Sequence, residues 1–104
     1  MRIINLHKFL NESKSEFILS KQLLRSGTAI GALINESEFA QSKVDFIHKM
    51  HLGLKEANET KYWISLLKDS GYITEKMFDS LLVDISQIIA LLVSIIKTSK
   101  SNLN

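Results

Sequence analysis

Two glutamates, Glu56 and Glu59, are the residues of this chain whose type and spacing could do chemistry. Carboxylates one helical turn apart can transfer protons or share a divalent cation. Carboxylate-bridged di-metal bundles, however, place a histidine three residues after a glutamate, and here Tyr62 and Trp63 follow Glu59 instead. We therefore predict no catalytic, cofactor-binding or metal-ligating residues, and no cofactor.

A packing role suits the two glutamates better, because they occupy the middle of a helical seam that is apolar at both ends. The seam consists of Leu52, Glu56, Glu59, Trp63 and Leu66. Burying an unpaired carboxylate is costly, so these groups need a partner. Arg25 lies in an internal stripe of the preceding helical segment, at a similar height if the two segments form an antiparallel hairpin. We predict a partly buried ion pair of Arg25 with Glu56 or Glu59, within the subunit or across an interface, and Trp63 as a core or interface anchor.

The remaining polar residues give no second candidate site. Asp45, His48 and His51 are spaced by three residues and drift around a helix by about 60° per step, so we expect solvated or capping roles. His7 is isolated and is expected at the surface. The chain has no cysteine, which excludes thiolate catalysis, disulfides and cysteine-based metal sites. It also lacks a glycine-rich phosphate loop, a nucleophile elbow and a zinc-protease motif, so no enzyme is predicted.

The elements that position these residues are all helical. With 104 residues, 45% of them hydrophobic, four glycines and no proline, residues 1–104 are expected to form one all-α domain. Helical spacing predicts segments from Arg2 to about Glu12, from Glu16 to about Ile34, from Ser42 to Asp69, and from a Thr74 cap to about residue 98, followed by a frayed tail.

Sequence signals also mark the ends of these helices. Serines in the polar break at 11–15 are expected to cap the second helix, and Ser37 or Ser42 the third. Gly71 is available for the left-handed conformation after the third helix. In the second helix, Gly27 and Gly31 lie one turn apart, where missing side chains are expected to let a neighbouring backbone approach closely.

Short connections favour an antiparallel up-down-up-down four-helix bundle with a short first helix. That helix offers only about 15 Å beside a third helix of about 42 Å. Part of the groove between helices two to four is therefore expected to be uncovered unless another chain fills it.

The last helix carries the strongest signal for self-association. Its apolar residues sweep roughly 200° of the helix surface, more than a single bundle can cover. The expected oligomer or core anchors are Trp63, Leu81, Ile85, Ile88, Leu92 and Ile95. Asp84 lies at the edge of this apolar arc and is expected to pair with a basic residue or a helix cap across the bundle.

Charge and hydropathy favour a cytoplasmic protein with no membrane partner. No secretory signal is visible, and the most apolar run, Ile88 to Ile96, is much shorter than the roughly 20 residues that cross a bilayer. A net charge of +2 does not by itself forecast nucleic-acid binding. If copies assemble symmetrically, Lys14, Lys21 and Arg25 are the candidate nucleic-acid contacts, because assembly repeats the patch.

Three segments resemble one family. They are QLLRSGTAIGA at 22–32, SKVDF at 42–46 and LKEANETKYW at 54–63. Together, in this order, they are similar to the bacterial four helix bundle proteins named for the intervening sequences of 23S ribosomal RNA genes. This group includes the accessory variability determinant of diversity-generating retroelements. The resemblance covers about residues 15–100.

The resemblance implies an up-down-up-down bundle that forms a homopentameric ring without enzymatic activity, acting as a scaffold or binding module. For the retroelement branch it implies binding to nucleic acid and to a nucleic-acid enzyme, a reverse transcriptase. The chain departs from the family in its shorter first helix and from that branch in its weaker positive charge. The main expectation is therefore a homo-oligomer, and the alternative is a nucleic-acid or ribonucleoprotein binding accessory protein.

Overall fold

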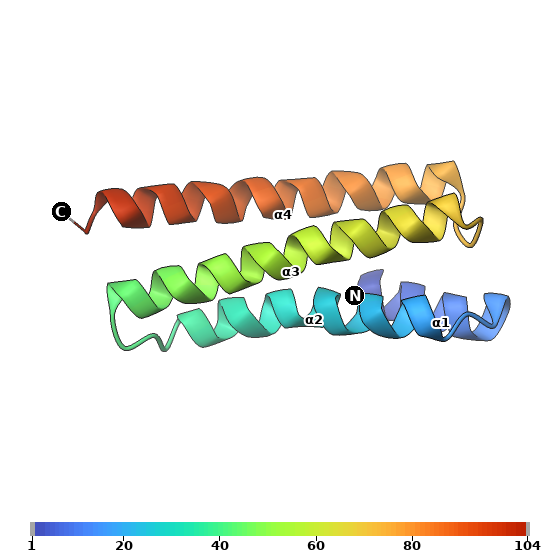
Figure 1. The fold of residues 1–104 in the computed structure, drawn as a ribbon, viewed down its shortest axis with the longest axis horizontal. Coiled ribbons are helices and arrows are strands. Elements are labelled where there is room, and N and C mark those ends of the chain that lie inside the picture. The colour runs from blue at the N-terminus through green and yellow to red at the C-terminus, as the bar shows by residue number, and fades with distance from the viewer. Residues whose placement is uncertain (1, 104) are drawn as a thin grey trace.

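The computed structural model describes residues 2–103, which form four helices and no strand. The helices are α1 (Arg2–Lys14), α2 (Ile18–Ser37), α3 (Lys43–Asp69) and α4 (Glu75–Ser101). They run up and down along one axis (Figure 1), in a molecule of 50 × 21 × 18 Å. The predicted all-α, up-down-up-down architecture with a short first helix is confirmed.

Three predicted helix ends are confirmed because their capping groups make the expected contacts. The Ser42 hydroxyl accepts a hydrogen bond from the Asp45 amide at 3.0 Å, at the start of α3. The Thr74 hydroxyl accepts one from the Met77 amide at 3.1 Å, at the start of α4. Gly71 has a φ of 82°, the left-handed conformation that stops α3.

The connection between α1 and α2 differs from the prediction that serines at 11–15 cap the second helix. α1 continues through that polar stretch to Lys14, and Ser15 reverses the chain with a φ of 52°. The Glu16 amide then donates to the Leu10 carbonyl at 2.9 Å, which closes the end of α1. Because Ser15 is used in the turn, no serine is left to cap α2.

Glu16 takes over that capping role. The N-cap residue Phe17 makes no side-chain hydrogen bond, and the carboxylate of Glu16 accepts from the Ser20 amide at 2.8 Å. Glu16 is only 7% exposed. The buried carboxylate therefore satisfies an amide that would otherwise lack a partner at the start of α2.

The expected frayed tail is also wrong for its first residues, because α4 continues as a helix to Ser101. The Asn102 amide still donates to the Thr98 carbonyl at 3.2 Å. Asn104, the last residue of that tail, lies outside the described residues. α2 likewise ends at Ser37, beyond the predicted Ile34.

Two apolar clusters form the core, one at each end of the molecule. The first consists of Leu6, Leu10, Leu23, Ile64, Leu67, Ile73 and Leu81. The second consists of Ile30, Met50, Ala57, Ile85, Leu92 and Ile96. A buried hydrogen bond from the Thr60 hydroxyl to the Ser26 hydroxyl, 2.9 Å long, joins α3 to α2. α1 contributes buried residues to the first cluster only.

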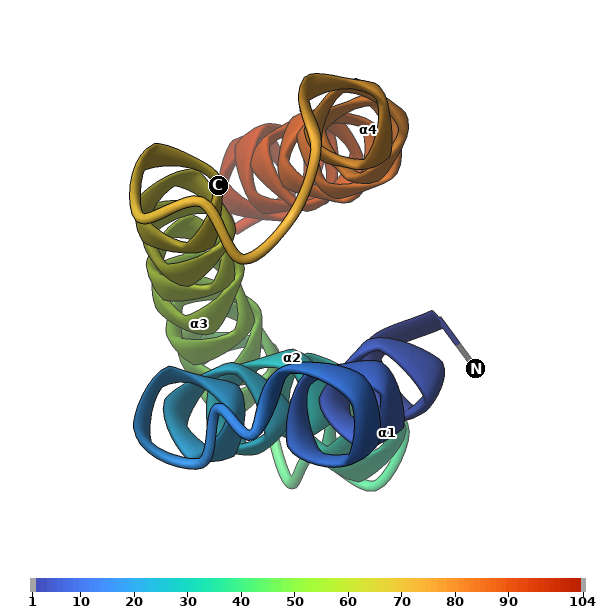
Figure 2. The same cartoon turned by 90° about the vertical axis from the view of Figure 1, so that its right-hand side faces the viewer.

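The four helices form an open arc rather than a closed square (Figure 2). α1 packs on α2, α2 on α3 and α3 on α4, with no comparable backbone packing of α4 against α1 or α2 in the described chain. Viewed along the helices, the arc is open between α4 and α1. The concave side of this arc holds the candidate site.

Candidate functional site

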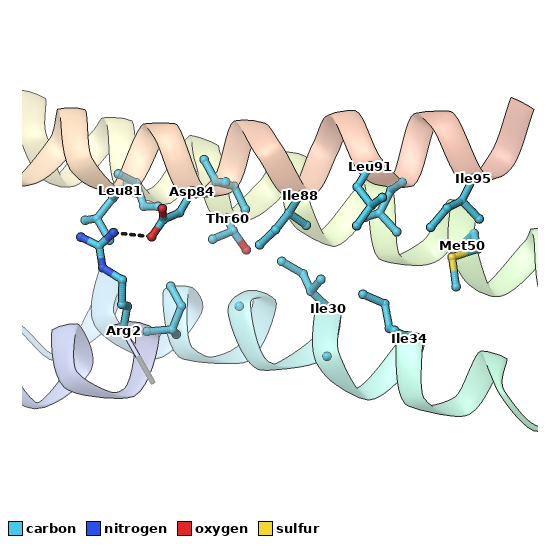
Figure 3. Close-up of a pocket in the computed structure, with 16 residues that line it drawn as sticks. Arg2, Ile30, Ile34, Met50, Thr60, Leu81, Asp84, Ile88, Leu91 and Ile95 are labelled. Atoms are coloured by element: carbon cyan, nitrogen blue, oxygen red, sulfur yellow. Dashed lines mark hydrogen bonds and ion pairs between the residues drawn. The ribbon is translucent and has the colours of Figure 1, made fainter.

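An apolar groove runs between α2 and α4, with α3 as its floor, and encloses about 440 Å³. Figure 3 shows Ile30 and Ile34 of α2 facing Ile88, Leu91 and Ile95 of α4 across it. Met50, Thr60 and Ile64 of α3 also contribute to the lining. Of α1, Arg2 and Ile3 border the groove.

The α4 wall of the groove is poorly covered for so apolar a helix. Leu91 is 60% exposed and Ile88 36% exposed, while Ile34 on the opposite wall is 38% exposed. Ile88, Leu91 and Ile95 recur at spacings of three and four residues, so they form one continuous ridge on the helix. This ridge is the surplus apolar surface expected from the sequence.

The predicted anchors divide into two groups. Leu81, Ile85 and Leu92 are buried inside the subunit, with at most 7% of each exposed, and so belong to its own core. All five line the groove, but Ile88 and Ile95 retain more exposed surface. Among these five α4 residues, Ile88 and Ile95 are the ones available to a partner.

An ion pair closes one end of the groove. The Arg2 guanidinium pairs with the Asp84 carboxylate (Figure 3), and it also donates to the Ser80 hydroxyl at 3.0 Å and to the Ser80 carbonyl at 3.3 Å. Arg2 is therefore the basic partner that Asp84 requires, and it bridges α1 to α4. Sequence reasoning found Asp84 from its position in an apolar arc, but Arg2, 82 residues away, carried no signal that could single it out.

The two glycines of α2 differ in what faces them. A Cβ atom added at Gly27 would lie 2.8 Å from Cγ2 of Ile3. The absence of a side chain at Gly27 therefore lets Ile3 of α1 pack close to α2. The approach involves a side chain of α1, not its backbone as expected. At Gly31 nothing lies within 4 Å of that position, and Gly31 lines the open groove.

The predicted charged cluster is brought together on the α2–α3 side of the molecule. Nη1 of Arg25 lies 3.2 Å from Oε2 of Glu56, and the guanidinium also pairs with Glu59. The indole N–H of Trp63 donates to Oε1 of Glu59 at 3.3 Å. Glu56 is the most buried of the ion-pair members, with 17% of its side chain exposed, whereas the Arg25 side chain is 49% exposed.

These contacts favour the charged form of both partners. The hydrogen bond from Arg25 holds the pKa of the Glu59 carboxyl below its ordinary value, against the opposing effect of desolvation. The hydrogen bond to Glu59 likewise raises the pKa of Arg25. The paired cluster joins α2 to α3 and thereby helps to fix their register.

The candidate nucleic-acid contacts differ in whether the structure pairs them with carboxylates. Arg25 is engaged by two carboxylates. Lys14 and Lys21 are exposed, Lys14 at the end of α1 and Lys21 on α2, and the Lys14 ammonium lies 5.9 Å from the centre of the Phe9 ring.

The residues weighed for metal binding take other roles. The Asp45 carboxylate accepts from the Gln41 amide at 3.3 Å, beside the Ser42 cap. His7 is not isolated as expected, because Nε2 lies 3.2 Å from the Asn11 side-chain amide. Over residues 2–103 no group of three or more histidine, aspartate or glutamate side chains is arranged to hold a metal ion.

Comparison with known proteins decides the family. A sequence model of the 23S rRNA-intervening sequence protein family matches residues 1–94. The chain belongs to this family. None of the curated proteins compared with the chain matches it.

A solved structure is also similar to this 23S rRNA-intervening sequence family member. It is the crystal structure at 1.70 Å of a protein of unknown function from the S23 ribosomal protein family of Bacteroides thetaiotaomicron. The sequences are 55% identical, the match covers 92% of this chain and 86% of the other, and the TM-score is 0.91. The likeness supports the bundle and the family, and it assigns no activity to either protein.

The length and hydropathy of α4 correct the argument from sequence that the most apolar run is too short to cross a bilayer. Within the described residues, α4 is long and apolar enough to span a membrane, with a mean hydropathy of 1.9 over its most apolar stretch, of which 22% is buried. The most apolar run, Ile88 to Ile96, underestimated this length, because isolated polar residues before it do not interrupt the helix.

Proposed function

We propose that this chain is a non-catalytic helical scaffold or binding module that works as a homo-oligomer in the cytoplasm. The supporting observation is the apolar ridge of α4, which is exposed along an open groove. Burying a Leu or Ile side chain completely contributes about 1.5–3 kcal/mol. Three such residues on each copy are enough to favour association over exposure to water.

The proposed assembly is a ring, with five copies as the number that the family resemblance implies. A closed ring hides the ridge of every copy, whereas an open chain of copies leaves the ends uncovered. The partner in this proposal is the protein itself.

We propose a protein partner for the apolar ridge of α4, and not a lipid bilayer. Beside the ridge, Leu81, Ile85 and Leu92 of α4 are already buried in the two core clusters, and Asp84 is ion-paired with Arg2. Insertion into a bilayer would have to break this packing or carry the charged pair with it.

The test is the mass of the purified protein in solution, by light scattering and native mass spectrometry from low to high micromolar concentration. We expect an oligomer of defined size. Leu91→Gln should shift it toward the monomer, because it places an amide on the ridge. Val83→Gln is the matched control, since Val83 is also exposed on α4, at 56%, but does not line the groove. A monomer at every concentration, for the unmodified chain, would refute the proposal.

The alternative function is nucleic-acid or ribonucleoprotein binding by the assembled ring, with Lys14, Lys21 and Arg25 as contacts. The pairing of Arg25 with two carboxylates argues against it. Fluorescence anisotropy with labelled RNA and DNA at low salt separates the two functions, because phosphate contacts produce a salt-dependent signal. If no binding is detected, the nucleic-acid function is rejected. If binding is detected and is lost in the double variant Lys14→Ala/Lys21→Ala, the nucleic-acid function replaces the scaffold function as the proposal.

A further inference from the structure

A chain of polar side chains joins α1 to the start of α2. Nδ2 of Asn11 lies 3.2 Å from Nε2 of His7, and Oδ1 of Asn11 lies 2.9 Å from the hydroxyl of Ser20. The same hydroxyl lies 2.8 Å from the carbonyl oxygen of Glu16. Ser20 is fully buried, so its hydroxyl must find its partners within this chain.

The Ser20 hydroxyl has one proton for two acceptors, so its hydrogen bonds have two possible directions. If the proton points to Oδ1 of Asn11, the amide group of Asn11 faces His7 and needs an unprotonated Nε2 as its acceptor. If the proton points to the Glu16 carbonyl, Oδ1 of Asn11 faces the lone pairs of Ser20 and the Asn11 amide must turn over. Its amide group then donates to Ser20, and its oxygen accepts from a protonated Nε2 of His7.

His7 selects between these two directions. Histidine is the side chain whose charge ordinarily changes between pH 5 and 8. A neutral ring with its hydrogen on Nδ1 accepts from Asn11, whereas the imidazolium ion carries hydrogens on both nitrogens and accepts nothing. Protonated His7 is therefore compatible only with the second direction, in which Asn11 is turned over.

The charged groups near this chain have other contacts. Of the four helices, α1 packs its backbone on α2 alone in the described chain. α2 presents the Glu16 carboxylate, which accepts from the Ser20 amide, and the exposed Lys21. Lys14, two turns after His7 on α1, lies over the Phe9 ring. These contacts leave His7 as the titratable group that Asn11 touches.

The elements on the other side of α1 add no charge to the chain. The side chains that α3 and α4 place in the core cluster with Leu6 and Leu10 are apolar. Asp84 of α4 is paired with Arg2, which lies more than one helical turn before His7.

We infer that His7 is a pH-responsive switch that sets the direction of the hydrogen bonds between α1 and α2. When Nε2 takes a proton from water, the Asn11 amide turns over and the Ser20 hydroxyl rotates from Asn11 to the Glu16 carbonyl. The change thus reaches the turn between the helices, which is closed by the bond from the Glu16 amide to the Leu10 carbonyl. The inference does not depend on self-association.

The test follows the isotope-labelled protein by NMR from pH 8 to pH 5. We expect Nε2 of His7 to be unprotonated at pH 8, and the side-chain amide resonances of Asn11 to shift with the midpoint of the His7 ring. Asn58 is the control in the same spectra, because its side-chain amide donates to the Leu54 carbonyl at 3.1 Å, and its resonances should not follow His7. A hydrogen on Nε2 already at pH 8 would overturn the inference, since Asn11 would then be turned over before the titration.

Two variants test the links of the chain separately, with circular dichroism as the check on folding. His7→Gln should abolish the shift of Asn11, whereas His48→Gln, at an exposed histidine of α3, should retain it. Ser20→Ala should retain the shift of Asn11 and lose the accompanying shift of the Glu16 carbonyl carbon. An Asn11 shift that persists in His7→Gln, or a Glu16 shift that persists in Ser20→Ala, would overturn the switch. The measurements on the unmodified protein decide the inference even if a variant fails to fold.

Discussion

The contact of Ile3 with Gly27 supports a quantitative test of how α1 is held on the bundle. The perturbation is a double-mutant cycle of Gly27→Ala and Ile3→Ala. In the intact chain, a Cβ at position 27 would lie 2.8 Å from Cγ2 and 3.0 Å from Cγ1 of Ile3. Both atoms are close to the branch point of the isoleucine, so they cannot move away without displacing the side chain or α1.

Two opposing effects set the expected magnitude. Replacing a mid-helix glycine by alanine contributes about 1 kcal/mol of helix stability. Overpacking against Ile3 costs about 1–3 kcal/mol. Gly27→Ala should therefore lower the free energy of unfolding by about 0–2 kcal/mol in the intact chain and raise it by about 1 kcal/mol in the Ile3→Ala background. The coupling energy between the two sites is then about 1–3 kcal/mol.

Urea unfolding of the four proteins at one fixed concentration measures this coupling, because self-association makes stability depend on concentration. Trp63, the only tryptophan, packs against the core cluster that contains Leu6 and Leu10 of α1, so its fluorescence reports the transition. The reasoning fails if Gly27→Ala stabilises the protein equally in both backgrounds, since α1 would then not approach α2 at this position.

Three further predictions concern the caps, the core and the charged cluster. Ser42→Ala and Thr74→Ala should each lower the free energy of unfolding by about 1 kcal/mol in urea titrations, because each removes the acceptor of a helix N-terminal amide; an unchanged midpoint for both would contradict the capping geometry. Leu92→Ala should cost about 2–5 kcal/mol, since Leu92 is 1% exposed, and a loss below that of an exposed control such as Val83→Ala would contradict its burial. Arg25 lowers the pKa of the Glu59 carboxyl below 4.5, so the carboxylate stabilises the fold fully above pH 4.5 and this contribution disappears as the pH falls through the lowered pKa. The free energy of unfolding of Glu59→Gln should therefore fall less on acidification than that of the unmodified protein. Identical pH profiles for the two proteins would refute the pairing.

Local signals in the sequence were sufficient for the helices and for most of their ends. Ser42, Thr74 and Gly71 act within a few residues of where they stand, so their roles follow from residue type and position alone. The connection from α1 to α2 was not predictable in this way. The polar stretch before Ser15 predicts a break between helices, yet its residues remain helical. The cap of α2 comes from Glu16, which is not a typical capping residue.

The charged cluster and the groove involve residues that are distant in the sequence, and the sequence predicted only some of their contacts. Arg25, Glu56 and Glu59 could be matched because an antiparallel hairpin fixes their relative heights. The partner of Asp84 could not, because Arg2 lies on a helix that no hairpin connects to α4. The unequal lengths of the helices predicted an uncovered groove, but only the three-dimensional structure shows that Gly31 opens into it while Ile3 fills the space at Gly27.

The open arc has a consequence for how the molecule opens. α4 packs its backbone closely on a single neighbouring helix, α3, and it joins the rest of the subunit only through side chains, which are those of the two core clusters and the Arg2–Asp84 pair. A helix whose backbone packs closely on one neighbour only is expected to detach as one cooperative unit before the other three helices unfold. In native-state hydrogen exchange, the amides of α4 in a dilute, dissociated sample should share one opening free energy, lower than that of α2 and α3.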